Sequence, residues 1–207
     1  MEKSRKSLQK IGIMGGTFNP IHYGHLVTAQ EALSQFNLDK VIFIPTGDPP
    51  HKTDEEIASA EHRYLMTVIA TASNSKFFVS RIEIDRKGKS YTIDTLRELR
   101  KIYTEDVSLY FITGADAILE ILTWKDTAEI LTLCKFIAAT RPGYDLSRLE
   151  SLKKKILDTE DKIFVMEVPA LAISSTDIRA RIKQQRPIDY LLPEGVCKFI
   201  LKNGLYR

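Results

Sequence analysis

The chain has 207 residues, of which 43% are hydrophobic and 28% charged, which is typical of a folded globular protein and excludes a wholly disordered chain. The formal net charge of +3 resides in residues 1–10, where four basic side chains accompany one acidic side chain. Because the rest of the chain is balanced in charge, the basic character does not indicate a nucleic-acid-binding face. No apolar run approaches the roughly 18 residues that a membrane span needs.

The N-terminal segment and the two cysteines favour a cytoplasmic protein. Only the stretch from Ile11 to Met14 is apolar after the basic segment, whereas a secretory signal needs about 7–15 apolar residues. Cys134 and Cys197 lie far apart without a CxxC motif, which favours buried thiols in a reducing compartment. We therefore expect a solvated basic tail over residues 1–10 and a single domain over residues 11–207.

Short apolar runs alternate with amphipathic segments along the chain, and this alternation predicts strands and helices in turn. In chain order we expect strand 10–14, helix 24–36, strand 40–44, helix 60–73, strand 77–84, helix 92–103, strand 107–113, helical material over 115–131, strand 135–139, helix 146–157, strand 162–168, and helices 175–184 and 194–203. The pattern predicts an α/β fold in which helices cover both faces of an open parallel sheet, with a small C-terminal helical extension. A long loop over residues 46–59 follows the second strand, and loops of this length are often functional.

In an open parallel sheet, ligands bind beyond the carboxyl ends of the strands. The first predicted strand is followed by Gly15-Gly16-Thr17-Phe18-Asn19-Pro20-Ile21-His22-Tyr23-Gly24-His25. Two glycines allow a sharp turn close to a ligand, and the two histidines are three residues apart at a helix start, where free N–H groups attract phosphate. The segment matches neither the GxGxxG fingerprint nor the GxxxxGK[ST] loop, and a zinc site would lack a third ligand nearby.

This segment resembles the GGTFDPxHxGH motif of the HxGH nucleotidyltransferases, in particular the bacterial adenylyltransferases that act on nicotinate mononucleotide. The resemblance covers residues 11 to about 192 and implies a Rossmann-like nucleotidyltransferase fold, with ATP as co-substrate. It implies a catalytic pair, His22 and His25, and an ATP-binding turn made of Gly15, Gly16, Thr17 and Phe18.

The metal position is not predicted by the sequence. The family has Asp or Asn at the position of Asn19, and an asparagine offers no carboxylate to a cation. Mg²⁺ binds readily through substrate phosphates while it keeps several waters. We therefore expect Mg²⁺ to be bound mainly through the phosphates of ATP.

A second phosphate site is predicted at the start of the helix 175–184. The segment Ile173-Ser174-Ser175-Thr176-Asp177-Ile178-Arg179 places three hydroxyls in succession before an arginine, whereas plain capping of a helix needs only one hydroxyl. Hydroxyls, free N–H groups and a guanidinium together suit a triphosphate. The match to the family's ISSTxIR motif implies that the β- and γ-phosphates of ATP are bound by Ser174, Ser175, Thr176 and Arg179.

Two further segments are expected on the ATP side. Gly114 and Asp116 follow the strand 107–113, and in the related enzymes this Gly-x-Asp meets the adenosine ribose. Residues 49–52 resemble the family's PPHK segment, in which Lys52 lies near the reacting phosphates as a mobile point charge.

The acceptor side is predicted from three positions. Thr92 opens a helix, and the resemblance implies that backbone groups around it meet the nicotinate carboxylate, an anion that the N–H groups of a helix start suit. Capping of the helix by Thr92 is the plain alternative. Trp124, the only tryptophan, lies in a polar setting that suits stacking, and the resemblance implies that it is the platform for the pyridine ring. Arg141, after the strand 135–139, is a weaker candidate for either ligand. His62 and Arg63 are expected to be surface residues of a helix.

Together these segments predict ATP-dependent adenylyl transfer to nicotinate mononucleotide, giving deamido-NAD and pyrophosphate in NAD biosynthesis. The acceptor phosphate is ionised at neutral pH, so we expect direct in-line displacement driven by positioning and charge stabilisation. Nicotinamide mononucleotide and phosphopantetheine stay open as acceptors, and a non-catalytic nucleotide sensor or RNA-binding module is the alternative from another class. We expect no nucleic-acid or membrane partner, and the oligomeric state stays open, a homo-oligomer included.

Overall fold

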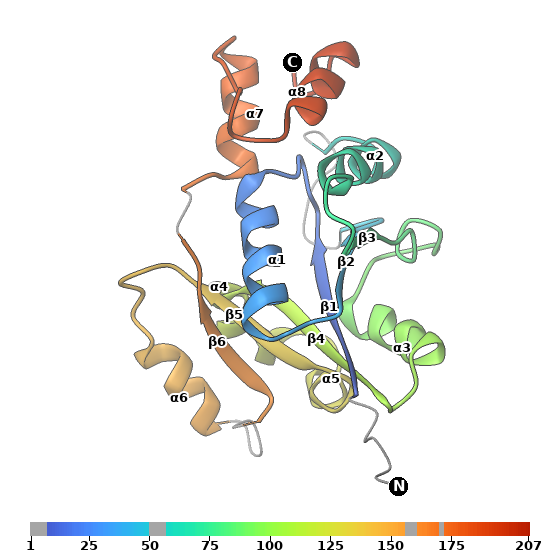
Figure 1. Ribbon diagram of the computed structural model, residues 1–207, viewed down its shortest axis with the longest axis vertical. Helices are drawn as coiled ribbons and strands as arrows, with labels where there is room; N and C mark the ends of the chain where they lie inside the picture. Colours follow the sequence, from blue (N-terminus) through green and yellow to red (C-terminus); the bar gives the residue numbers. More distant parts are fainter. Residues whose placement is uncertain (1–7, 50–56, 156–160, 170–171) are drawn as a thin grey trace, which may run out of the picture.

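The computed structural model describes residues 8–49, 57–155, 161–169 and 172–207 (Figure 1). Within them, six strands form one parallel sheet in the order β3-β2-β1-β4-β5-β6. The strands are β1 (Gln9–Gly16), β2 (Lys40–Pro45), β3 (Phe77–Val79), β4 (Val107–Gly114), β5 (Lys135–Thr140) and β6 (Ile163–Glu167). The order reverses between β1 and β4, so a switch point lies at the carboxyl ends of these two strands. The expected α/β parallel sheet is confirmed.

Helices cover both faces of the sheet, which explains why the central strands are continuous apolar runs. One hydrophobic cluster is closed by α1 (Tyr23–Gln35), α2 (Ala60–Thr71), α7 (Ser175–Lys183) and α8 (Glu194–Lys202). The other is closed by α3 (Thr92–Ile102), α4 (Ala115–Leu119), α5 (Thr127–Leu133) and α6 (Ser147–Lys155). Figure 1 shows α7 and α8 beyond the end of the sheet at which α1 begins. In the part of the chain that the structure describes, no helix is both long and apolar enough to cross a membrane.

Most element boundaries lie within one or two residues of the expected ones, and three differences affect how the elements are described. The edge strand β3 ends at Val79, because the chain turns where the N–H groups of Ile84 and Asp85 donate to the carbonyl of Arg81. The expected helical material over 115–131 is split into α4, a 3₁₀ turn and α5, and Asp126 takes a left-handed backbone conformation before α5. Strand β1 already begins at residue 9, so residues 9 and 10 belong to the sheet rather than to a tail.

Arg63 is buried, contrary to the surface position expected for it. It is 1% exposed and is the largest fully buried side chain among the described residues. Its guanidinium donates from Nη1 to the Thr17 carbonyl (2.8 Å), from Nη2 to the Gly47 carbonyl (3.0 Å) and from Nε to the Ala58 carbonyl (3.0 Å). The rigid guanidinium of Arg63, which carries five N–H donors, thus joins the loop after β1 to both ends of the segment between β2 and α2.

Both cysteines are buried free thiols, as expected. Burial raises the pKa of the Cys134 thiol to about 12, which keeps it protonated and unreactive at neutral pH. The two residues belong to different hydrophobic clusters, on opposite faces of the sheet. They therefore contribute to packing and not to chemistry.

Candidate active site

The two predicted phosphate segments are in direct contact. The Arg179 guanidinium donates to the Asn19 carbonyl at 2.9 Å, and the Ser175 hydroxyl donates to the Pro20 carbonyl at 2.8 Å. These contacts join residues 160 and 155 positions apart in the sequence. The loop after β1 and the start of α7 therefore form one structural unit at the carboxyl end of β1.

His22 and His25 lie side by side at the N-terminus of α1. Their ring centroids are 3.8 Å apart, and Nδ1 of His25 accepts the backbone N–H of His22 at 3.2 Å. The Phe18 ring meets the His25 ring edge-on at 5.0 Å. A Cβ on Gly24 would lie 3.0 Å from the His22 ring, so the glycine leaves room for that imidazole. The local sequence thus sets the relative position of the two imidazoles before any ligand binds.

Burial keeps both imidazoles neutral. Burial lowers the pKa of His22 to about 4, and burial together with the neighbouring His22 lowers the pKa of His25 well below its ordinary value. Nδ1 of His22 is buried and has no hydrogen-bond partner among the residues that the structure describes. A buried polar atom left unpaired costs about 1–3 kcal/mol, so this nitrogen is suited to a partner supplied from outside the chain.

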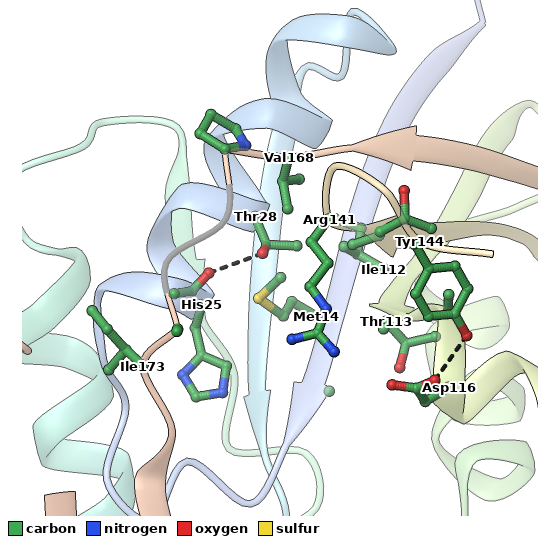
Figure 2. A pocket seen from close by; sticks show the side chains of 18 residues that line it. Met14, His25, Thr28, Ile112, Thr113, Asp116, Arg141, Tyr144, Val168 and Ile173 are labelled. Atoms are coloured by element: carbon green, nitrogen blue, oxygen red, sulfur yellow. Dashed lines mark hydrogen bonds between the residues drawn. The ribbon is translucent and has the colours of Figure 1, made fainter. Parts of the chain in front are cut away.

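A cavity of about 530 Å³ opens at the carboxyl ends of β1, β4 and β5 (Figure 2). Its volume lies in the range typical of small-molecule and cofactor sites. Figure 2 shows His25 on one side of the cavity and Asp116 on the other, with Arg141 between them. The predicted site residues that line it are Gly15, His25, Gly114, Asp116 and Arg141.

Tyr144 is a cavity residue that sequence reasoning missed. Its hydroxyl donates to Oδ1 of Asp116 at 2.8 Å, and this hydrogen bond is the main reason that the pKa of Tyr144 is raised. Tyr144 follows the turn after β5, whereas Asp116 follows β4, so only the pairing of these two strands brings them together. No local motif marks a tyrosine in that turn.

The segments that carry Thr92 and Trp124 are in contact on the face of the sheet covered by α3 and α5. The Lys125 ammonium lies 4.9 Å from the centre of the Tyr91 ring and 3.7 Å from a carboxylate oxygen of Asp94, which joins the start of α3 to the segment before α5. Tyr91, and not Thr92, is the N-cap of α3, and its side chain makes no capping hydrogen bond. In the described part of the chain, the N-cap residue therefore leaves the start of α3 without a side-chain cap, as a site for a carboxylate requires.

Trp124 connects this region to β1. Its ring is half-buried and meets Phe111 and Phe136 edge-on, with centroids 6.1 and 6.3 Å apart. A Cβ added at Gly15 would in turn lie 3.2 Å from the Phe111 ring. Gly15, Phe111 and Trp124 thus follow one another across the switch point, although part of the tryptophan surface serves packing. The two glycines belong to the end of strand β1 and not to the turn expected for them.

The remaining predicted residues have mixed placements. The Ser174 hydroxyl caps α7 by accepting the N–H of Asp177 at 3.1 Å, and Thr176 is exposed beside it. Phe18 is 2% exposed and its side chain belongs to the core, so it is not a surface residue of the cavity. Lys52 lies outside the described residues.

The described residues offer no protein cage for a metal ion. None of their His, Cys, Asp and Glu side chains gather in a group of three or more that could hold a metal. Oδ1 of Asn19 already accepts hydrogen bonds from the Ala58 N–H at 3.0 Å and from the Tyr206 hydroxyl at 2.7 Å. This donor set does not fit direct ligation, so a metal here would have to depend on ligand oxygens.

Comparison with known proteins assigns the family. The model of cytidylyltransferase-like proteins matches residues 13–181. Probable nicotinate-nucleotide adenylyltransferases of Moorella thermoacetica and of a Thermoanaerobacter species are 61% and 57% identical, each over 96% of this chain and over 92% and 94% of their own lengths. The nicotinic acid mononucleotide adenylyltransferase of Plasmodium falciparum complexed with NaAD has the same fold, with a TM-score of 0.77 at 23% identity over 96% of this chain and 97% of its own. The chain therefore belongs to the cytidylyltransferase-like family, among the nicotinate-nucleotide adenylyltransferases.

Proposed function

We propose that this chain transfers the adenylyl group of ATP to nicotinate mononucleotide, giving deamido-NAD and pyrophosphate in NAD biosynthesis. One observation carries the proposal: the loop that leads from β1 into the histidine pair contacts the start of α7, and His25 of that pair lines a cavity of nucleotide size. The near full-length relatives bear the name of this activity. The two free, buried cysteines suit the reducing cytoplasm in which we expect the enzyme to act.

The cavity is the proposed site of the adenylate part of ATP. Asp116 would accept ribose hydroxyls, and its hydrogen bond to Tyr144 orients the carboxylate for this purpose. We assign Arg141 to ATP rather than to the acceptor, because it lines the same cavity as Asp116. The triphosphate would run toward His25 and the exposed hydroxyls of Ser174 and Thr176 at the start of α7, where helix N–H groups add positive potential.

The acceptor would bind across the switch point. The uncapped start of α3 at Thr92 offers N–H groups to the nicotinate carboxylate, and the exposed part of Trp124 offers a face to the pyridine ring. The acceptor phosphate would then approach Gly15, at the end of β1, from the side opposite the ATP cavity. This arrangement suits attack in line with the leaving group.

In the proposed step, an oxygen of the acceptor phosphate forms a bond to the α-phosphorus of ATP while the bond from that phosphorus to the bridging oxygen breaks. The electron pair leaves with pyrophosphate, and no proton has to be removed from the nucleophile. The imidazoles of His22 and His25 donate N–H groups to the phosphate oxygens, and an anion beside them favours their protonated forms. Arg179 and Lys52 offset the charge that moves onto pyrophosphate. A preorganised donor of this kind contributes about 10²- to 10³-fold to kcat.

Mg²⁺ would be carried by the phosphates. It would neutralise phosphate charge when it is bound. No step is assigned to a protein–metal bond, because the described residues offer no group of ligands for it.

The proposal is tested by measuring pyrophosphate release with ATP and one acceptor at a time. We expect rapid release with nicotinate mononucleotide, at least tenfold lower kcat/KM with nicotinamide mononucleotide, and none above background with phosphopantetheine. A preference for the amidated acceptor would contradict the assignment of the α3 start to a carboxylate. ATP binding without any pyrophosphate release would instead indicate a nucleotide sensor.

A further inference from the structure

The C-terminal end of the chain reaches the loop after β1. Tyr206, the penultimate residue, donates its hydroxyl to Oδ1 of Asn19 at 2.7 Å across 187 positions of sequence. The chain turns back after α8 at Gly204, whose φ is 61°, and the Leu205 N–H donates to the Ile200 carbonyl. Tyr206 itself has a φ of 67°, a conformation that is uncommon for a bulky side chain and that tends to occur at functional sites.

The surroundings of the Tyr206 hydroxyl keep it protonated and able to donate. Burial raises the pKa of Tyr206, and the guanidinium groups of Arg179 and Arg63 lie close enough to oppose that shift. Tyr206, Arg179 and Ala58 also line a common cavity of about 240 Å³. The tyrosine therefore lies beside a residue of the proposed phosphate site and not at a remote surface.

Asn19 is the point at which these contacts meet. Its side-chain oxygen accepts from Tyr206 and from the Ala58 N–H, while its carbonyl accepts from Arg179. Phe18, immediately before it, has a φ of 47°, so the surrounding contacts must hold this loop in an uncommon conformation. Removing one of the two donors to Oδ1 would loosen the asparagine and, with it, the carbonyl that positions Arg179.

We propose that Tyr206 is a positioning residue for adenylyl transfer, which holds Arg179 in place through Asn19. The inference rests on the proposed function, in which Arg179 offsets charge on the leaving pyrophosphate. It follows that the tyrosine acts on kcat and, in the reverse reaction, on the KM for pyrophosphate. It does not act on the KM for nicotinate mononucleotide, whose proposed site lies on the other face of the sheet.

The test compares Tyr206→Phe, which removes only the hydroxyl, with the control Tyr103→Phe. The Tyr103 hydroxyl also makes one hydrogen bond, from Lys40 Nζ at 3.2 Å, but at the start of β2, the opposite end of that strand from the site. In Tyr206→Phe we expect kcat to fall about 3- to 10-fold, the size of one hydrogen bond, and the KM for pyrophosphate to rise by a similar factor. The KM for nicotinate mononucleotide should stay within twofold, and Tyr103→Phe should match the wild type.

A double-mutant cycle with Arg179→Lys checks the route of the effect. If Tyr206 acts through Arg179, Tyr206→Phe should lower kcat by less than about twofold in the Arg179→Lys background. An equal loss in both backgrounds, or unchanged kinetics with only a lower Tm, would overturn the inference while leaving the proposed function intact. A wild-type protein that makes no deamido-NAD from ATP and nicotinate mononucleotide would overturn the proposed function, and this inference with it.

Discussion

The phosphate end and the nucleoside end of the site are built in different ways. At the phosphate end, Asn19 and His22 are 3% and 6% exposed. The loop after β1 is held there by hydrogen bonds from Arg63 and Arg179 to its backbone carbonyls and from Tyr206 to the Asn19 side chain. At the nucleoside end, the exposed Asp116 is joined to Tyr144 by one hydrogen bond. The difference indicates that side chains are held in precise positions where bonds break, whereas the nucleoside end only has to bind the nucleoside.

The largest expected effect comes from removing a donor at the phosphate end. His25→Ala should lower kcat about 10²-fold or more, because the donor acts on charge that develops in the transition state. Circular dichroism should show a normally folded protein. His62→Ala is the matched control, because His62 lies on α2 and its ring contacts Phe199 of α8 instead of the cavity. Near-normal turnover of His25→Ala would contradict the catalytic role proposed for this histidine.

The second prediction concerns Arg63, whose hydrogen bonds support the loop after β1 at the phosphate end. Arg63→Met should lower the free energy of unfolding by about 2–3 kcal/mol, since the carbonyls of Thr17, Gly47 and Ala58 lose their donor. For a chain of this length the loss corresponds to a fall in Tm of roughly 4–12 °C, measurable by calorimetry. Arg81→Met, which removes an exposed guanidinium paired with Glu61, should change Tm much less. An equal fall in Tm for the two variants would contradict the stabilising role of the buried Arg63 guanidinium.

The sequence predicts the features that depend on local patterns, and it does not predict those that depend on contacts between distant segments. The parallel sheet and the histidine pair follow from local patterns, namely apolar runs of strand length and a turn with fixed spacing. The burial of Arg63 and the contact between Tyr206 and Asn19 join segments far apart in the chain, and no local pattern reports them. An arginine on an amphipathic helix is assigned to the surface by default, because its charge is costly to bury without partners.

The third prediction concerns how the stability of the folded protein depends on pH through His22. The pKa of His22 is about 4 in the folded protein and ordinarily about 6.5, so the unfolded chain binds more protons between these values. Stability from this group is fully present above pH 6.5 and is lost as the pH falls toward 4, by about 2 kcal/mol at pH 5. Urea unfolding at pH 7.5 and 5.0 should therefore show a larger loss for the wild type than for His22→Gln. An equal loss in both proteins would mean that the imidazole is not held neutral.

The smallest expected effects are at the two sites that bind the nucleoside parts, that of the acceptor at Trp124 and that of ATP at Tyr144. Trp124→Leu keeps an apolar contact with Phe111 and Phe136 but removes the aromatic face. It should raise the KM for nicotinate mononucleotide about 5- to 10-fold, the size of one stacking contact, with kcat and the KM for ATP within about twofold. Tyr144→Phe should give the reverse pattern, with a modest rise in the KM for ATP alone. A matched rise of both KM values in Trp124→Leu would indicate a packing role.

The central claim is that the phosphate end works by position and charge alone, without a covalent enzyme intermediate. The most direct test is the stereochemical course of the reaction with one diastereomer of ATP that carries sulfur on the α-phosphorus. A single in-line displacement predicts inversion of configuration at that phosphorus in the deamido-NAD analogue. Retention would require two successive displacements through an adenylylated side chain, and it would contradict the account.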